Sequence, residues 1–184
     1  MLRKAYLEIT NVCNLACSFC PGTRREKRFM PAREVKVLAA KIRPHTQYLY
    51  LHLMGEPLLH PELPEILEIC HELDFKLIIT TNGTLLPERT ELLIGSPAVH
   101  KINISLQSFE ANKKGVLEDY IRSCASFARE VTGAGKLCVL LYNTFYQNMN
   151  TRGVGQAKAV IFFLIVAAVG LVQLYLTRKK EVQQ

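Results

Sequence analysis

The sequence predicts an α/β fold built on a sheet of about five parallel strands. Between residues 4 and 141, short β-like runs alternate with amphipathic helical segments. Strands that alternate with helices of this length indicate βαβ units and hence a parallel sheet. The composition agrees, because 49% of the 184 residues are hydrophobic and 21% are charged, which is typical of a chain with a packed core.

Each predicted element has local features that fix it. Pro31 suits the first turn of a helix, where a missing N–H costs nothing. Gly55 and Pro57 end the second strand, and the turn pair Asn82-Gly83 ends the third. Strands are expected at 5–10, 48–54, 76–81, 99–106 and 136–141, and helices at 31–43, 63–73, 87–94 and 117–131.

Three cysteines that follow the first predicted strand indicate a metal centre. Cys13, Cys17 and Cys20 form a Cys-x3-Cys-x2-Cys pattern, which one loop can wrap around a single centre. A structural zinc ion takes four protein ligands, and a four-cysteine iron–sulfur cluster has a thiolate on every iron. Three cysteines on a four-iron cluster would leave one iron open to a ligand that is not protein.

Two other interpretations fit the three cysteines less well. A disulfide framework is disfavoured, because the N-terminus has no apolar signal-peptide core and the chain is long and poor in cysteine. Zinc would need a fourth ligand such as His45, His52 or His60, none of which has a usual zinc-finger spacing. Cys70, Cys124 and Cys138 are isolated, and we expect them to behave as small buried hydrophobes.

The other informative motifs also follow predicted strands. Gly55-Glu56-Pro57 follows the second strand, Asn82 follows the third, and Ser105 closes the fourth. The carboxyl ends of parallel strands meet at one edge of the sheet, where ligands bind. We therefore expect these residues and the three cysteines to form one site.

Together these motifs resemble the radical S-adenosylmethionine (radical SAM) superfamily. The cysteine spacing with Phe19, the Gly-Glu-Pro turn and the Thr-Asn-Gly turn occur in the family's order. The resemblance implies that Cys13, Cys17 and Cys20 bind a 4Fe-4S cluster. It also implies an S-adenosylmethionine (SAM) site: Gly55, Glu56 and Pro57 form the turn in which Glu56 receives the amino group, Phe19 lies near the adenine, and Asn82 and Ser105 line the pocket.

The resemblance also implies a fold, a reaction and partners. The fold would be an incomplete radical SAM (β/α) partial barrel. An external flavodoxin- or ferredoxin-like donor would reduce the cluster, and cleavage of SAM would give a 5′-deoxyadenosyl radical that abstracts hydrogen from an unidentified substrate. Residues 102–109 further resemble members with a SPASM-type C-terminal extension. The sequence has no counterpart of that extension or of the family's sixth βα unit.

The composition changes after residue 141. We expect a partial radical SAM core at 1–141, a linker at 142–157, a transmembrane helix at 158–177 and a basic tail at 178–184. An 18-residue apolar run at 159–176, broken only by Gln173, would span about 27 Å as a helix, marginally enough for a bilayer. A buried core helix is the alternative. These features predict a single-pass membrane protein with the iron–sulfur domain in the cytoplasm, although Arg178, Lys179 and Lys180 would then lie outside, against the positive-inside tendency.

The C-terminal segment suggests a second hypothesis for the chain. Residues 148–184 resemble the last helix of sugar-type ABC transporter permeases, whose C-terminus is cytoplasmic. The chain would then be chimeric or truncated, with a permease-derived helix, and would bind the cluster without turnover. The net charge of +7 comes partly from Arg24, Arg25, Lys27, Arg28 and Arg33. We interpret them as a solvated or substrate-facing loop, and we expect no nucleic-acid partner.

Overall fold

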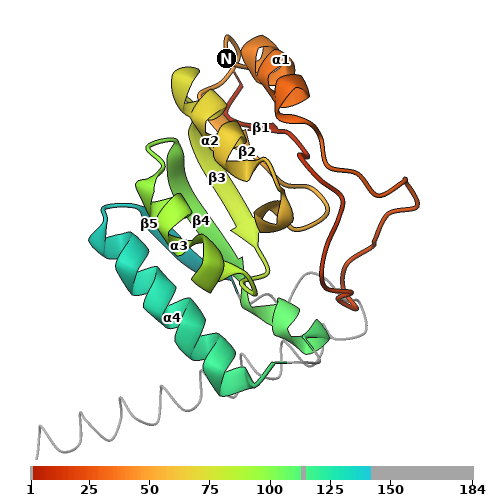
Figure 1. The fold of residues 1–184 in the computed structure, drawn as a ribbon, viewed down its shortest axis with the longest axis vertical. Helices are drawn as coiled ribbons and strands as arrows, with labels where there is room; N and C mark the ends of the chain where they lie inside the picture. The colour runs from red at the N-terminus through yellow and green to blue at the C-terminus, as the bar shows by residue number, and fades with distance from the viewer. Residues whose placement is uncertain (1, 113–114, 142–184) are drawn as a thin grey trace, which may run out of the picture. The chain divides into compact units, whose positions relative to one another are not determined.

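The computed structural model describes residues 2–112 and 115–141, which form a single α/β unit. Its strands are β1 (Ala5–Tyr6), β2 (Tyr48–Tyr50), β3 (Lys76–Thr81), β4 (Val99–Ser105) and β5 (Leu137–Leu141). Its helices are α1 (Ala32–Ile42), α2 (Leu63–Glu72), α3 (Leu86–Gly95) and α4 (Leu117–Gly133), with 3₁₀ helices at Pro57–Leu59 and Leu106–Ala111. The alternation of strands and helices follows the sequence prediction (Figure 1).

The five strands pair in chain order, and every pairing is parallel. Tyr6 lies beside Tyr50, Tyr50 beside Ile78, and Ile78 beside Lys101. Parallel neighbours need a crossover between them, and the helices supply it. The predicted sheet of about five parallel strands is therefore confirmed.

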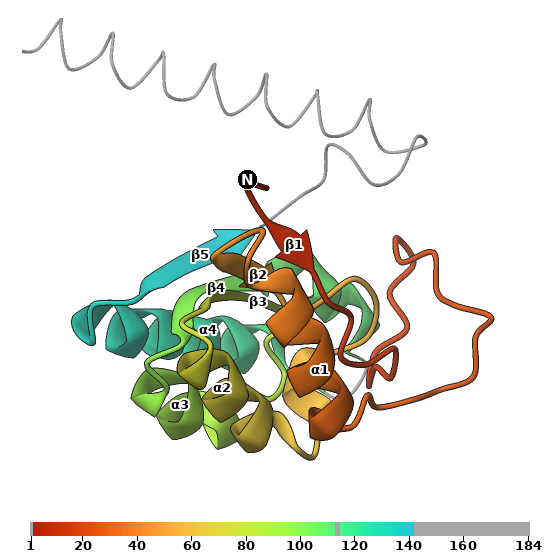
Figure 2. The same cartoon turned by 90° about the horizontal axis from the view of Figure 1, so that it is seen from above.

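All four α-helices cover one face of the sheet (Figure 2). The core lies between these two layers, as the alternation of side chains along each strand requires. Its fully buried members come from both layers and include Leu49, Leu77, Ile79, Ile102, Val35, Ile66, Leu93 and Val131. The opposite face of the sheet carries a cluster of rings, in which Tyr6 and Tyr50 lie 4.6 Å apart between ring centroids and His52 lies 5.9 Å from each.

Two strands end four residues earlier than the sequence predicts, whereas β4 and β5 differ from the prediction by one residue each. β1 ends at Tyr6 instead of residue 10, and β2 ends at Tyr50 instead of residue 54. Beyond Tyr6 the chain leaves the ladder, and Thr10 forms an antiparallel bridge with Phe29. Beyond Tyr50 the backbone N–H of Met54 donates to the Glu8 carboxylate at 3.1 Å. Leu51 is still buried beyond β2, but Leu53 is exposed, so the alternation that predicted a strand to residue 54 does not continue to its end.

Within residues 2–112 and 115–141, no helix has the length and apolar character that a membrane span requires. The linker, transmembrane helix and basic tail predicted for residues 142–184 lie outside the described residues.

Candidate functional site

The predicted site residues gather around one cavity at the carboxyl ends of the strands. The cavity has a volume of about 440 Å³ and is lined by all three motif cysteines together with Phe19, Gly55, Glu56, Asn82 and Ser105. Of the predicted set, only Pro57 does not line it. Pro57 is buried as the first residue of a 3₁₀ helix, where it fixes the turn that presents Glu56.

The cysteine loop has contacts to a distant segment of the chain. Cys13 and Cys20 are exposed, whereas Cys17 is half-buried. Burial raises the pKa of the Cys17 thiol. The backbone N–H of Ser18 and its hydroxyl donate to Glu110 Oε1 at 3.2 and 2.6 Å. This attachment fixes the loop between Cys17 and Cys20 to the 3₁₀ helix that follows β4.

The turn after β2 depends on close backbone contact with the cysteine segment. Gly55 has a φ of +76°, and a Cβ atom there would lie 2.6 Å from the carbonyl oxygen of Thr10 and 2.8 Å from that of Val12. The N–H of Glu56 donates to that same Val12 carbonyl at 2.8 Å. Glycine is therefore required, because it alone combines a positive φ with so close an approach.

Glu56 is a buried carboxylate in the wall of the cavity, with an exposed fraction of 1%. Its oxygens accept hydrogen bonds from the backbone N–H groups of Leu58 at 3.1 Å and Asn82 at 2.7 Å. Burial raises the pKa of this carboxyl, and the two backbone bonds oppose that shift. Two hydrogen bonds leave acceptor capacity on a carboxylate for a cationic group in the cavity.

The Asn82 side chain joins the turn after β3 to the cysteine loop. Its Nδ2 donates to Asn14 Oδ1 at 2.8 Å and lies 3.8 Å from Cys13 Sγ. Its backbone carbonyl accepts from the buried Tyr120 hydroxyl at 2.8 Å. Ser105 is half-buried at the end of β4, on the same rim of the cavity. The predicted convergence of Cys13, Asn82 and Ser105 at one sheet edge is therefore present.

Sequence reasoning did not assign two other residues of this cavity, His52 and Lys27, to the cofactor site, although it considered His52 as a zinc ligand. His52 lines the cavity, and its Nδ1 is buried without a hydrogen-bond partner within the part of the chain that the structure describes. Burial lowers the pKa of His52 to about 4. Lys27 lines it as well, from the loop that follows the cysteines. The alternation of Tyr48, Tyr50 and His52 in the predicted strand could have indicated that His52 shares a face with the two tyrosines. Nothing in the sequence pattern distinguished Lys27 from its basic neighbours.

The thiols suit a cluster better than a single ion. All three are free and share one cavity, and thiolates are the usual ligands of iron–sulfur clusters. Among the described residues, no three His, Cys, Asp or Glu side chains lie close enough to hold one metal ion. Of the histidines considered for zinc, His45 and His60 lie outside the cavity lining, and His60 is bonded to the carbonyl oxygen of Met30. His52 does line the cavity, but within the described residues it belongs to no set of three His, Cys, Asp or Glu side chains close enough to hold one ion. In a cluster each thiolate binds a different iron, so the thiols need not converge on one point.

Comparison with known proteins places the chain in a family. A model described as the radical SAM superfamily matches residues 7–147. GTP 3′,8-cyclase of Aquifex aeolicus is 27% identical over 126 residues, which are 61% of this chain and 37% of that protein. The structure of Streptococcus suis SuiB bound to S-adenosylmethionine has a similar fold, with a TM-score of 0.60 and 23% identity over 78% of this chain and 35% of that one. The chain thus spans well under half the length of these relatives.

A separate match concerns a short stretch of the sequence. A starch degradation products transport permease, AmyD of Thermoanaerobacterium thermosulfurigenes, is 49% identical over 43 residues, which are 23% of this chain and 14% of the permease. This short partial match gives the predicted permease-like ending weak support.

Proposed function

Because the chain belongs to the radical SAM superfamily, whose members bind a 4Fe-4S cluster and S-adenosylmethionine, we propose that both cofactors bind in the cavity at the carboxyl edge of the sheet. Cys13, Cys17 and Cys20 would hold the cluster. The single observation that carries this proposal is that three free thiols and one buried carboxylate, distant in sequence, line the same cavity.

The other residues of the cavity have roles that follow from their chemistry. The Glu56 carboxylate accepts from the amino group of SAM, and its bonds to Leu58 and Asn82 hold it in place for this contact. Asn82 and Ser105 offer polar groups to the nucleoside, and Phe19 offers an apolar surface near the adenine. Pro57 acts through the turn and does not contact the ligand.

When bound, the two cofactors supply reductive cleavage of SAM to methionine and a 5′-deoxyadenosyl radical that abstracts hydrogen from a substrate. The protein positions the reacting groups and excludes water. One electron must enter from outside, so we include a flavodoxin- or ferredoxin-like donor among the partners. The exposed Cys13 and Cys20 place the metal-binding loop at the surface, where such a donor can approach.

Anaerobic reconstitution of the full chain with iron and sulfide tests this proposal. We expect iron, sulfide and the visible spectrum of one 4Fe-4S cluster, and loss of all three in the Cys13→Ala, Cys17→Ala and Cys20→Ala variants. Cys138→Ser is a matched control, because this half-buried thiol is outside the cavity lining. Full spectral intensity in the triple variant would show that the cluster site is wrongly assigned. Formation of 5′-deoxyadenosine from SAM after reduction tests the chemistry separately.

The C-terminal segment supports a secondary proposal, a membrane anchor at 158–177, through its apolar run and the short permease match. Sequencing the transcript across codons 135–150 separates an anchored enzyme from a mis-joined chain. An uninterrupted reading frame, with the protein recovered in washed membranes, is expected for the anchor. A frameshift or breakpoint in these codons would instead favour the chimeric alternative.

A further inference from the structure

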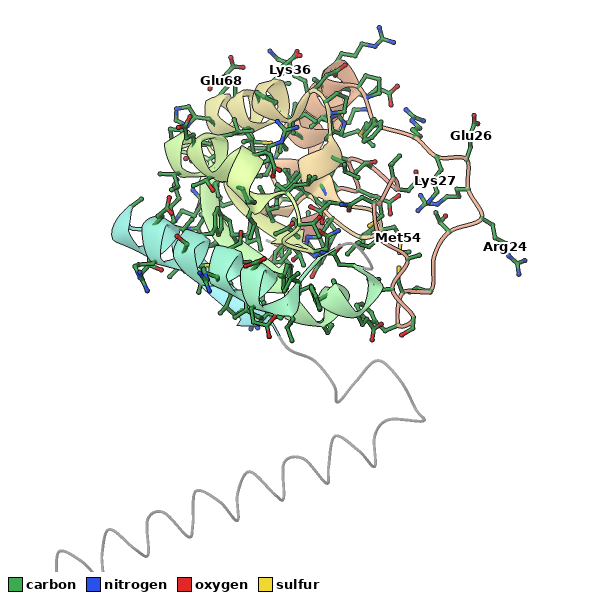
Figure 3. The ribbon with its side chains drawn as sticks, turned by 60° about the horizontal axis from the view of Figure 1, so that its bottom comes forward. Arg24, Glu26, Lys27, Lys36, Met54 and Glu68 are labelled. Atoms are coloured by element: carbon green, nitrogen blue, oxygen red, sulfur yellow. The ribbon has the colours of Figure 1, made fainter. Side chains whose placement is uncertain are left out.

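The N-terminal end of α4 lies beside the 3₁₀ helix that follows β4 (Figure 1, Figure 3). Tyr120, in the first turn of α4, makes this contact, because its ring packs against that of Phe109 with 5.1 Å between the ring centroids. The tyrosine is buried, and it is not among the described residues that line the cofactor cavity. Tyr120 can therefore act on a bound ligand only through the residues that it holds.

The Tyr120 hydroxyl contacts both of the turns that carry predicted site residues at this edge. It donates to the carbonyl oxygen of Asn82 at 2.8 Å and lies 3.4 Å from the carbonyl oxygen of Ser105. A hydroxyl has one proton to donate, so the shorter bond to Asn82 is the main one. The turn after β3 lies close above the hydroxyl, since a Cβ atom on Gly83 would be 3.0 Å from it. One side chain of α4 thus joins the turn after β3 to the end of β4.

The backbone of Asn82 is held at both of its polar groups. Its N–H donates to Glu56 at 2.7 Å, and its carbonyl oxygen accepts from Tyr120. The Asn82 side chain then bonds on both sides of the cavity edge, with Oδ1 accepting from the N–H of Thr84 at 3.0 Å and Nδ2 donating to Asn14 at 2.8 Å. The direction of this side chain toward the cysteine loop therefore depends on the Tyr120 bond.

The attachment of α4 to the sheet does not require this hydroxyl. The buried face of the helix continues beyond Tyr120 with Cys124, Phe127 and Val131, which belong to the apolar core. A buried tyrosine hydroxyl needs a hydrogen-bond partner, and here that partner is a residue of the cofactor site. Loss of the hydroxyl should therefore shift the two turns, while apolar packing still holds the helix in place.

We propose that Tyr120 is a positioning residue of the cofactor site, whose hydroxyl sets the position of Asn82 and Ser105 toward bound S-adenosylmethionine. This role rests on the proposed function, which gives those two residues their contacts with the nucleoside. Small displacements matter in such a site, because a shift of about 1 Å can cost about 100-fold in rate. Although α4 contributes no described residue to the cavity lining, it thereby becomes a part of the site.

Binding of SAM by the cluster-loaded full chain tests this role. Tyr120→Phe removes only the hydroxyl, whereas the control Phe127→Leu removes apolar contacts two turns further along α4, outside the cavity lining. We expect Tyr120→Phe to keep its iron and sulfide and to weaken SAM binding by about 3- to 10-fold, the usual effect of losing one neutral hydrogen bond. Phe127→Leu should lower the thermal midpoint at least as much and leave the affinity for SAM unchanged.

Hydrogen exchange in the apoprotein measures the positioning without any cofactor. The Asn82 amide is protected by its bond to Glu56, and it should exchange about 10-fold faster in Tyr120→Phe when its rate is divided by that of Ile79, in the middle of β3. A variant that only destabilises the whole fold raises both rates together. Phe127→Leu should therefore leave this ratio as it is in the wild type.

The outcomes separate this inference from the proposed function. The role of Tyr120 is overturned if Tyr120→Phe binds SAM as tightly as the wild type, if Phe127→Leu weakens SAM binding by the same factor, or if the exchange ratio does not change. An unprotected Asn82 amide in the wild-type apoprotein would overturn it as well, even if Tyr120→Phe failed to fold. If the cluster-loaded wild type binds no SAM, the proposed function itself fails, and the exchange ratio alone decides whether Tyr120 holds the turn.

Discussion

The backbone N–H of Asn82 donates a hydrogen bond of 2.7 Å to Glu56 Oε2. This bond joins the turn after β2 to the turn after β3, and both partners are buried. The other oxygen of Glu56 accepts from Leu58 at 3.1 Å within its own turn. One carboxylate thus has two roles. It fixes the relative position of two site-forming turns before any ligand binds, and it presents a negative charge to the cavity.

Glu56→Gln should therefore destabilise the protein even without cofactors. Glutamine offers one carbonyl acceptor, so its NH₂ group would face one of the two backbone N–H donors. An unpaired buried donor costs about 1–3 kcal/mol, and removing a buried charge offsets a part of this. We expect a net loss of about 1–2 kcal/mol, measured by urea unfolding of the apoprotein at neutral pH. Glu68→Gln, on the exposed side of α2, is the control. Its free energy of unfolding should equal that of the wild type, and an equal value for Glu56→Gln would contradict the prediction.

Gly55 and Gly22 allow backbone strain to be separated from steric clash. Both have positive φ, +76° and +66°, but a Cβ at Gly22 meets nothing within 4 Å, whereas one at Gly55 overlaps backbone oxygens. A left-handed non-glycine residue costs about 1–3 kcal/mol. Gly22→Ala should lose stability by about that amount, and Gly55→Ala by clearly more. Equal unfolding free energies for the two variants would contradict the close packing of the Gly55 turn against Thr10 and Val12.

The sequence was informative where local pattern determines the result. β3 spans Lys76–Thr81 as predicted, because its apolar run and the Asn82-Gly83 turn define both ends. The cysteine, Gly-Glu-Pro and Thr-Asn-Gly motifs were expected to meet at one edge of the sheet, because each follows a strand of the same parallel sheet. All of the predicted site residues except Pro57 line one cavity there. The ends of β1 and β2 were predicted wrongly, because the end of a strand depends on where its partner strand diverges.

Lys27 shows why the rest of the site was not predictable. In the sequence it is one of several cations that follow the cysteines, and the pattern did not distinguish a solvated loop from a substrate-facing one. Its inward direction depends on the hydrogen bonds of Asn11, which lies 16 residues away. His52 likewise acquires its low pKa from burial next to the rings of Tyr6 and Tyr50. Such pairings come from tertiary structure and have no local signature.

The contact between Ser18 and Glu110 should affect the cluster more than the fold. Both side chains are exposed, and the bond ties the segment between Cys17 and Cys20 to the 3₁₀ helix that follows β4. We expect Glu110→Ala to change the free energy of unfolding by roughly 0.5 kcal/mol or less but to speed the loss of iron to a chelator. Glu130→Ala is the matched control, because it removes a similar exposed bond, to Ser126 on α4. Identical rates of iron loss in the two variants would argue against this anchoring role.

His52 should make the stability of the protein fall as the pH is lowered. Its pKa is about 4 in the folded protein, where burial disfavours the charged ring, and about 6.5 when the chain is unfolded. Between these values the unfolded state binds more protons, so stability is complete above about pH 6.5 and declines toward about pH 4. His52→Phe should remove this part of the pH dependence, whereas His71→Gln, at an exposed position on α2, should not. Urea unfolding of the apoprotein at a series of pH values measures the difference. NMR titration of the His52 ring checks its cause directly, and a midpoint near 6.5 in the folded state would show that the ring is not desolvated.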